Sequence, residues 1–561
     1  MRLISNVSIL ILIISQGFCE IVEISDGKVS GIVMKTRYDE NFHAYMGIPY
    51  AEKPLGDKRF RAPIKVSSWS GVLNATEFSP MCMQVNLLSQ SPVAEDCLYL
   101  NVFTKNLPLS RENETLQPVV VYIHGGSFQL GSASDHKPHL LMERNVVLVS
   151  FNYRLGAFGF LSLGNEEIPG NAGFKDQVMV LEWVQNNIHH FGGDPKLVTL
   201  MGNSAGAYGV TAHMVSSMSK GLFHRVVALS GSITYQRKLE DNYLDLGRRL
   251  AEKMNCTVSD IDEMIKCLRE KPAVDFNLIE LREYPQCTIM TWFPVIEKDF
   301  GQRRFLSDDP KKLFQSANFS KVPIIIGRTK DEFVDIPSRM IQFPIIDELN
   351  QRYDEVAPHC FFYETNTEKS RSQTLKDVYF PYDVIDIKSL SSLSQIFSDG
   401  YIGYPVHKLA HLISNLTDVF YYQLSFIGRY SFFLHPHDKP YGVHHSDEMQ
   451  YILETVFVGP RIELNDPENV MVERFTRIIY QFASSGDPND KNDDYLNEMF
   501  WPKHDSINEF YLDIGSHFIE KHGLALDRYA AWDELENDAS VIFKFEIIQL
   551  LLASVMLIKL F

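Results

Sequence analysis

Five short, almost uninterrupted apolar runs set the strongest limit on how this chain can fold. Strands buried on both faces of a sheet have this composition, whereas strands with one wet face alternate apolar and polar residues. The segments between the runs are long enough for the helical crossovers that parallel strands need, and residues 178–188 form one amphipathic candidate. We therefore expect an α/β fold with a large, mostly parallel central sheet and helices on both faces. The runs are residues 119–123, 146–151, 198–201, 226–229 and 322–326.

The beginning of the chain has a different pattern. Residues 21–24 and 29–34 are rich in β-branched side chains, and the turn sequence Ser-Asp-Gly lies between them. This pattern predicts a small antiparallel hairpin. No repeat, heptad or Pro/Gly-rich linker interrupts the rest of the chain, so we expect a single domain over residues 20–540.

The first 19 residues have the layout of a signal peptide. Met1 and Arg2 precede the apolar residues 7–14, and small residues occupy the positions favoured for cleavage before residue 20. After cleavage six cysteines remain, an even number that suits an oxidising compartment. We expect a secreted or cell-surface protein. Five Asn-x-Ser/Thr glycosylation acceptors agree with this expectation: Asn74, Asn113, Asn255, Asn318 and Asn415.

The hydrophobic tail, residues 541–561, is a poor transmembrane segment. Its apolar part, residues 547–561, includes Gln549 and Lys559 and is shorter than the ~20 residues that span a bilayer. Small residues at 537–540 followed by a short spacer have the layout of a glycosylphosphatidylinositol (GPI) attachment signal. An amphipathic C-terminal helix and an uncleaved tail are the alternatives.

The overall charge argues against one class of partner. The formal net charge is −18, and no cluster of Lys and Arg is present. Phosphate binding needs such clusters. We therefore expect no nucleic-acid partner.

The sequence Gly-Asn-Ser-Ala-Gly at 202–206 follows the apolar residues 197–201 and precedes a helix-compatible stretch. This order is typical of a sharp strand-turn-helix elbow that exposes a nucleophilic serine, here Ser204. By itself the pattern is weak, because most short glycine-serine patterns are ordinary turns. It gains weight only if a base, an acid and oxyanion donors occur elsewhere.

Candidates for all of these groups follow predicted strands or lie downstream. The glycine turn at 124–128 leaves backbone amides of Gly126 and Ser127 free to join that of Ala205 as oxyanion donors. Glu332 follows the run 322–326, and His445 lies in the segment 442–449. A lone acidic pair or histidine is usually structural, but the order serine, acid, histidine is that of α/β-hydrolases.

Several motifs in order resemble the type-B carboxylesterase/cholinesterase family over about residues 20–535. This resemblance implies one α/β-hydrolase domain. The motifs are Tyr-Met-Gly-Ile-Pro-Tyr-Ala at 45–51, Arg-Phe at 59–60, Glu-Asp-Cys-Leu-Tyr-Leu-Asn-Val at 95–102, Asn-Tyr-Arg-Leu-Gly at 152–156, Gly-Asn-Ala-Gly-Phe-Lys-Asp-Gln at 170–177 and Phe-Gly-Gly-Asp-Pro at 191–195.

The resemblance assigns roles to individual residues. It implies Ser204, Glu332 and His445 as the catalytic triad, with His444 at a variable position, and requires no metal or cofactor. The oxyanion donors that it implies are the amides of Gly126, Ser127 and Ala205. It also implies two disulfides, Cys82 with Cys97 and Cys256 with Cys267, while Cys287 and Cys360 either pair or remain free.

Three residues depart from the family pattern. Ser127 stands where glycine or alanine is common, which would narrow the acyl pocket. Asn203 stands where cholinesterases have glutamate, and Phe333 where glycine usually follows the acid. We also expect the pocket to depend on the loop 282–293 and on the packing of Phe128, Phe293 and Phe333.

The function implied is a serine carboxylic ester hydrolase for small or lipophilic esters. Choline esters are not expected, because the segment between Cys82 and Cys97 contains no Trp, Tyr or Phe to face a quaternary ammonium. The chain is similar to insect detoxifying, odorant and hormone esterases, although juvenile hormone esterases usually have Gln in place of Asn203. The alternative is a non-catalytic, cholinesterase-like adhesion ectodomain, a class that lacks a triad member.

Overall fold

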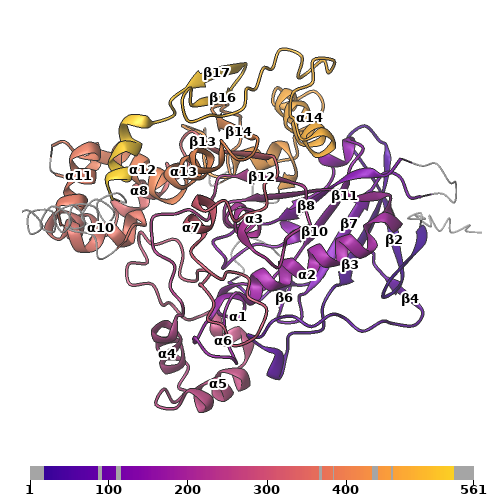
Figure 1. Cartoon of the computed structure of the whole chain (residues 1–561), viewed down its shortest axis with the longest axis horizontal. Coiled ribbons are helices and arrows are strands. Elements are labelled where there is room, and N and C mark those ends of the chain that lie inside the picture. Colours follow the sequence, from indigo (N-terminus) through magenta and orange to yellow (C-terminus); the bar gives the residue numbers. More distant parts are fainter. Residues whose placement is uncertain are drawn as a thin grey trace, which may run out of the picture.

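The computed structural model describes residues 18–85, 91–108, 115–364, 369–382, 384–432, 440–455 and 459–535. Within these residues the largest sheet has 13 strands, and helices surround it (Figure 1). In spatial order the strands are β1 (Phe18–Ile24), β2 (Gly27–Lys35), β3 (Asn41–Pro49), β7 (Tyr99–Thr104), β10 (Val147–Phe151), β8 (Gln117–Ile123), β11 (Gly193–Asn203), β12 (Arg225–Leu229), β13 (Ile324–Thr329), β14 (Val419–Leu424), β16 (Phe510–Ile514) and β17 (Phe518–His522), with β4 (Val72–Asn74) beside β2.

The five apolar runs fall in β8, β10, β11, β12 and β13 at the centre of this sheet. All neighbouring pairs from β10 to β16 are parallel. The expected mostly parallel core is therefore confirmed. The N-terminal hairpin is also present, with Ile24 paired to Gly27, but β3 and β7 join it to the main sheet through antiparallel pairing.

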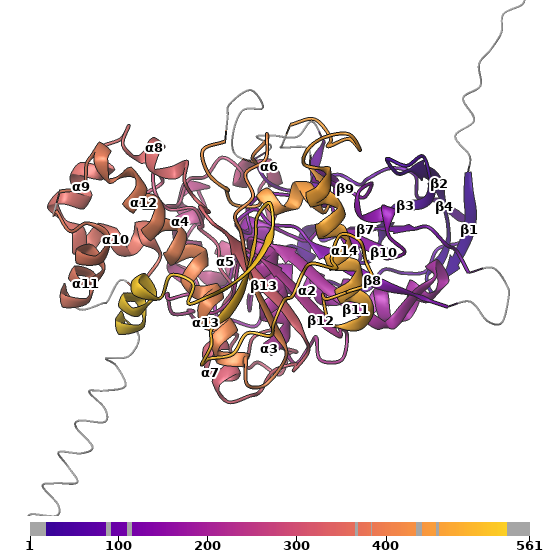
Figure 2. The ribbon, with the colours of Figure 1, turned by 90° about the horizontal axis from the view of Figure 1, so that it is seen from above.

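The helices cover both faces, as Figure 2 shows from above. They are α1 (Gly156–Phe160), α2 (Ala172–Asn187), α3 (Ala205–Val215), α4 (Leu244–Lys253), α5 (Ile261–Glu270), α6 (Ala273–Phe276), α7 (Pro310–Gln315), α8 (Ile336–Met340), α9 (Ile345–Gln351), α10 (Tyr353–Phe361), α11 (Lys369–Tyr379), α12 (Leu390–Ser398), α13 (Tyr404–Ile413) and α14 (Asn469–Ser485). The amphipathic segment expected at 178–188 lies almost entirely in α2.

Alternation along β8 explains why helices are needed on both sides. Val119 and Val121 contribute to a core shared with α2, α3 and α13, whereas Val120 and Tyr122 point into a second core shared with α14. Successive strand residues face opposite sides of a sheet. Because both sets are apolar, each face needs its own helical cover.

Three disulfides brace the loops around the sheet. Cys82 bonds to Cys97 and Cys256 to Cys267, as the resemblance implied, and Cys287 bonds to Cys360. The third bond settles the alternative left open by the sequence. It ties the loop after α6 to α10, 73 positions along the chain.

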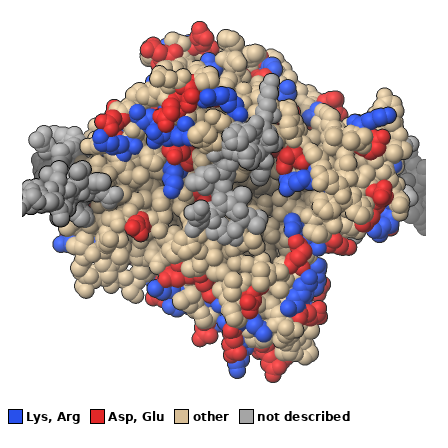
Figure 3. Space-filling view, turned by 180° about the vertical axis from the view of Figure 1, so that it is seen from behind, with Lys and Arg blue, Asp and Glu red and all other residues tan. Residues whose placement is uncertain are grey.

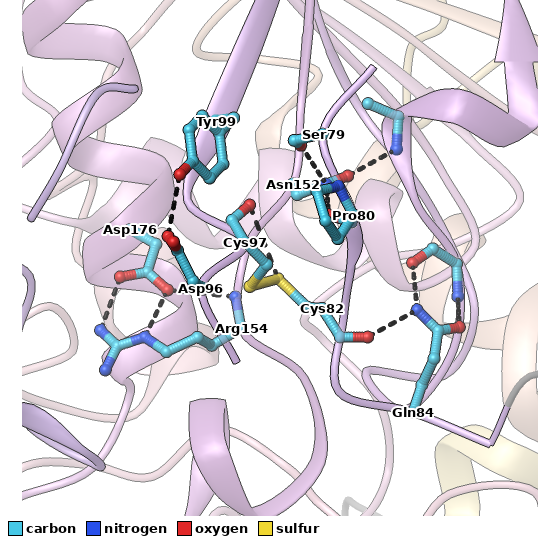
Figure 4. Close-up of a disulfide and its surroundings, with 12 residues drawn as sticks. Ser79, Pro80, Cys82, Gln84, Asp96, Cys97, Tyr99, Asn152, Arg154 and Asp176 are labelled. Atoms are coloured by element: carbon cyan, nitrogen blue, oxygen red, sulfur yellow. Dashed lines mark hydrogen bonds and ion pairs between the residues drawn. A yellow bond between two sulfur atoms is a disulfide. The ribbon is translucent and has the colours of Figure 1, made fainter. Parts of the chain in front are cut away.

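A buried ion pair lies close to the first disulfide (Figure 4). Arg154 donates from Nε and Nη2 to the two carboxylate oxygens of Asp176, at 2.8 and 2.6 Å, and both residues are buried. Both belong to sequence motifs that carry the family resemblance. Their role is structural, because this fork joins the segment after β10 to α2.

The glycosylation acceptors and the two ends of the chain are relevant to the expectation of a secreted or cell-surface protein. Asn74, Asn255, Asn318 and Asn415 are exposed, as glycan acceptors must be. Asn113, most of the expected signal peptide (residues 1–17) and the whole tail 541–561 lie outside the described residues. No helix among the described residues is both long and apolar enough to cross a bilayer. On the face drawn in Figure 3, basic and acidic side chains are interspersed.

Asp176→Asn should destabilise the protein strongly. The substitution leaves the Arg154 guanidinium buried and without its counter-charge, a change that costs about 3–5 kcal/mol. The free energy of unfolding from urea titration should fall by this amount. The matched control is Asp39→Asn, which removes the exposed ion pair with Lys35 and should cost less than ~1 kcal/mol. Equal losses in the two variants would contradict the structural role of the buried pair.

Candidate active site

Ser204 occupies a strained elbow between β11 and α3. Its φ of 55° and ψ of −124° are unusual for a non-glycine residue. Two glycines permit the turn. A Cβ on Gly202 would lie 2.4 Å from the carbonyl oxygen of Gly206, and a Cβ on Gly206 would lie 2.0 Å from that of Ile123. The Gly-x-Ser-x-Gly pattern is therefore a steric requirement of this elbow.

The second predicted turn follows β8. Gly126 has a φ of 110° and Ser127 a φ of 56°, so the chain turns sharply a few residues after β8 ends at Ile123. Gly126, Ser127 and Ala205 all line one cavity with Ser204. Among the described residues, none of these three amides donates a hydrogen bond to another group of the protein. They are available to a group in the cavity.

His445 and Glu332 form a buried pair. The distance between His445 Nδ1 and Glu332 Oε2 is 2.5 Å, and the side chains are 5% and 0% exposed. The other carboxylate oxygen of Glu332 accepts a hydrogen bond of 2.8 Å from the amide of Thr329. His445 Nε2 has no hydrogen-bond partner among the described residues. The imidazole thus has one nitrogen fixed by a carboxylate and one available.

Backbone hydrogen bonds between two loops hold this pair in place. The amide of Asp331 donates to the carbonyl of Val443, and the amide of His445 donates to the carbonyl of Glu332, at 3.0 and 2.7 Å. Asp447, two residues further on, accepts from the amide of His444 at 2.8 Å. The acid and the histidine, 113 positions apart, are aligned by main-chain contacts as well as by their side chains.

The charges around His445 favour the protonated form of its ring. Burial lowers the pKa of the His445 ring, but the charge of Glu332 and its hydrogen bond outweigh this effect, so that the pKa lies above its usual value of 6.5. Two further carboxyl groups follow in the same loop. Burial raises the pKa of Asp447 and that of Glu448 to about 7. Negative charge is therefore costly here, except where a partner compensates it.

The cavity has a volume of about 780 Å³, and both Ser204 and His445 line it. Of the three phenylalanines expected to shape it, Phe333 is a lining residue, but Phe128 and Phe293 are not among the described lining residues. Phe128 instead packs in the core against Phe160, Phe174 and Tyr208. Part of the loop 282–293, including Arg282 and Trp292, does line the cavity.

Phe333 has a contact that the sequence did not predict. Its ring lies 4.8 Å from the His445 ring, centroid to centroid, and packs edge-on against Phe397 and Tyr401. The position directly after Glu332 places the ring against the imidazole. A side chain at this position limits the space beside the histidine, which a glycine would leave open.

Asn203 joins the elbow to the histidine loop. Its amide nitrogen donates to Ser446 Oγ at 2.9 Å, and its amide oxygen accepts from the Tyr122 hydroxyl at 2.8 Å. The sequence showed only that a neutral residue replaces the glutamate of cholinesterases. The contact with Ser446 spans 243 positions, and no local pattern could have revealed it.

Together these groups suit acyl transfer. A hydroxyl on a sharp turn, an imidazole oriented by a carboxylate and a set of backbone amides around one cavity are the parts that such chemistry needs.

Comparisons with known proteins find similarity to esterases. A model of the carboxylesterase family matches residues 19–532. Esterase FE4 of Myzus persicae is 34% identical over 490 residues, which cover 84% of this chain and 85% of that esterase. Juvenile hormone esterase of Heliothis virescens is 29% identical over 85% of this chain and 86% of its own length.

A solved structure agrees with the fold. The crystal structure of juvenile hormone esterase from Manduca sexta, with OTFP covalently attached, superposes with a TM-score of 0.82 at 28% identity. The match covers 92% of this chain and 99% of the solved one. The sheet described above is accordingly that of an α/β-hydrolase.

Asn203→Ala should loosen the loop that carries His445. The variant loses both hydrogen bonds of the amide, so backbone amides at 443–447 should exchange with deuterium faster than in the unaltered protein. Ser446→Ala removes one of these bonds from the other side and should have a similar, smaller effect. Since the two residues share a contact, the effects of the two substitutions should not add in the double variant. Unchanged exchange in Asn203→Ala would contradict the link.

Proposed function

Because this chain belongs to the carboxylesterase family and is a carboxylic ester hydrolase, we propose that it cleaves small or lipophilic carboxyl esters through Ser204, His445 and Glu332. One observation carries the proposal. Ser204 and His445 line the same cavity, and the His445 nitrogen Nδ1 is hydrogen-bonded to the buried Glu332. The relatives described above are named as esterases, which disfavours the alternative of a non-catalytic adhesion ectodomain.

In the first half-reaction His445 Nε2 takes the proton of the Ser204 hydroxyl while its oxygen attacks the ester carbonyl. Glu332 holds the imidazole in the tautomer protonated at Nδ1 and stabilises the positive charge that the ring acquires. The carbonyl oxygen becomes negative in the tetrahedral intermediate. The amides of Gly126, Ser127 and Ala205 donate to this oxygen.

Collapse of the intermediate breaks the bond to the alcohol, which leaves with the proton from His445. The acyl group then remains on Ser204 as an ester. Water attacks this acyl-enzyme after giving a proton to His445, and the carboxylic acid leaves as the proton returns to Ser204. These reaction steps need no metal or cofactor.

The lining of the cavity supports the substrate class. Apolar and aromatic residues form much of the wall, and Leu155, Phe158, Trp292 and Phe333 are among them. Burial of apolar groups against such walls is the main source of affinity for a lipophilic ester. The hydroxymethyl group of Ser127 narrows the side of the cavity next to the oxyanion donors.

We further propose that the protein leaves the cell after removal of residues 1–19, with glycans on its exposed Asn-x-Ser/Thr acceptors. The three disulfides support an oxidising compartment. The tail 541–561 is proposed to be exchanged for a lipid anchor.

Ser204→Ala should reduce hydrolysis of p-nitrophenyl butyrate on the order of 10⁶-fold, as loss of a serine nucleophile does. An organophosphate probe should label Ser204, as seen by mass spectrometry of the labelled peptide. The control Ser217→Ala alters an exposed serine and should retain full activity. Equal turnover by Ser204→Ala and the unaltered enzyme would refute the proposed nucleophile.

The pH profile tests the role of Glu332. The imidazole must be neutral to accept a proton, so kcat/KM should fall as the pH drops through the His445 pKa, which lies above 6.5. In Glu332→Gln burial still lowers this pKa but the carboxylate charge is gone. The acid limb should therefore move to lower pH, and the plateau should drop by about 10⁴-fold.

The control for this profile is Glu348→Gln, which changes a carboxylate that pairs with Arg352 on the surface. Its acid limb should coincide with that of the unaltered enzyme. An acid limb that stays in place in Glu332→Gln would mean that Glu332 does not set the pKa of the base.

The tail is tested on expressing cells. If residues 541–561 are replaced by a GPI anchor, phosphatidylinositol-specific phospholipase C should release most of the surface esterase activity into the medium. A variant that ends at residue 536 should appear in the medium without the phospholipase. Activity that stays with the cells after treatment would count against the anchor.

A further inference from the structure

Asp135 lies in the wall of the same cavity and takes no part in the mechanism proposed above. It ends the short turn Ala133–Asp135 that follows the oxyanion turn, and it is 1% exposed. Neither of its carboxylate oxygens has a hydrogen bond of standard geometry among the described residues, and the hydroxyl and amide of Ser132 are the donors close enough to stabilise its charge. The nearby Ser132 hydroxyl is 2.8 Å from that of Ser134.

The other charged residues of the wall are paired. Arg282 forms an ion pair with Glu280, and Arg339 forms one with Asp335, each at 2.6 Å. Among the described lining residues Asp135 is thus the charged group that lacks a counter-ion. Burial raises its pKa to about 6, although hydrogen bonds from Ser132 and the charge of Lys137 offset part of the rise. The carboxylate is therefore mostly ionised at neutral pH.

The next residue in the chain also has an unpartnered atom. His136 follows Asp135 and also lines the cavity, and its Nδ1 has no hydrogen-bond partner among the described residues. Burial, helped by His124, lowers the pKa of His136 to about 3. The ring is therefore neutral, and its Nδ1 accepts a hydrogen bond when the proton is on Nε2.

The loop that carries these groups is fixed. Gln84 exchanges two hydrogen bonds with the backbone of Gly131, and Asn152 accepts one from the amide of Ala133. On the other side His136 pairs with Thr455 in the two-stranded sheet of β9 (His136–Lys137) and β15 (Glu454–Thr455). These contacts hold the backbone on both sides of Asp135 in place.

An ionised carboxylate buried without a counter-ion is unfavourable unless a ligand provides one. We propose that Asp135 and His136 form a subsite for a protonated amine, so that the substrates of this enzyme include esters that carry an amino group with at least one N–H. A charged N–H donor compensates the Asp135 charge and makes a strong hydrogen bond. This inference rests on the proposed function and deepens it.

Two matched esters test the subsite. 3-(Dimethylamino)propyl butyrate is protonated at pH 7.5 and carries one N–H, and 4-methylpentyl butyrate is its neutral isostere. In the unaltered enzyme the amino ester should have the higher kcat/KM. Asp135→Asn should lower the ratio of the two kcat/KM values at least about tenfold, the effect of one hydrogen bond to a charged group. The ratio cancels any general effect of the substitution on folding or chemistry.

The matched control is Glu348→Gln, which also removes one negative charge, but at the surface, where Glu348 pairs with Arg352. The ratio should stay as in the unaltered enzyme. An unchanged ratio in Asp135→Asn would overturn the proposal and leave the carboxylate as the site of a bound water. An equal fall of the ratio in both variants would also overturn it, because the effect would then be one of overall charge.

Binding without turnover separates this inference from the proposed function. N,N-dimethylpropylamine at pH 7.5 should bind the full-length protein in calorimetry at least about tenfold more tightly than trimethylpropylammonium, which has the charge but no N–H. The preference should disappear in Asp135→Asn. If neither ester is cleaved but the amine binds with this preference, the proposed function fails and the subsite stands. Equal binding of the two cations would overturn the subsite.

Discussion

The close approach of α3 to the end of β8 is the contact on which the site depends. With no side chain at Gly206, the helix begins so near to Ile123 that a Cβ would lie 2.0 Å from its carbonyl oxygen. This contact brings Ser204, at the start of α3, next to the turn with Gly126 and Ser127 that follows β8. The hydroxyl and the backbone amides therefore reach one cavity because two neighbouring parallel strands end at the same edge.

The second requirement is electrostatic. Glu332 is fully buried, and such a carboxylate is tolerated because the imidazole of His445 and the Thr329 amide both contact it. Asp447 and Glu448 lie in the loop that carries His445, and burial raises the pKa of both. Further negative charge near His445 is therefore unfavourable. Asn203, which is neutral, fits this environment better than a glutamate would. It also joins the elbow to Ser446 in the histidine loop.

Departures from the family pattern are concentrated around this charge system and the cavity wall. Phe333 covers one side of the imidazole, and Ser127 lines the cavity beside Gly126. Asp135, which has no counter-ion among the described lining residues, adds a charge to the same wall. The proposed catalytic groups and the proposed substrate subsite thus lie on different residues of one cavity. The backbone that carries both sets is held by disulfides and by buried pairs such as Arg154 with Asp176.

The apolar runs by themselves determined the central strands, because a strand buried on both faces must be apolar throughout, and the elbow motif located Ser204, because its steric demand is local. The family resemblance supplied the partners Glu332 and His445 and two disulfides. Only the tertiary structure decided the pairing of Cys287 with Cys360, the link from Asn203 to Ser446, the packing of Phe128 in the core and the lack of a counter-ion near Asp135 among the described lining residues. These features arise from contacts between segments far apart in the chain, or from the lack of a partner after packing, and neither leaves a periodic or local signal in the sequence.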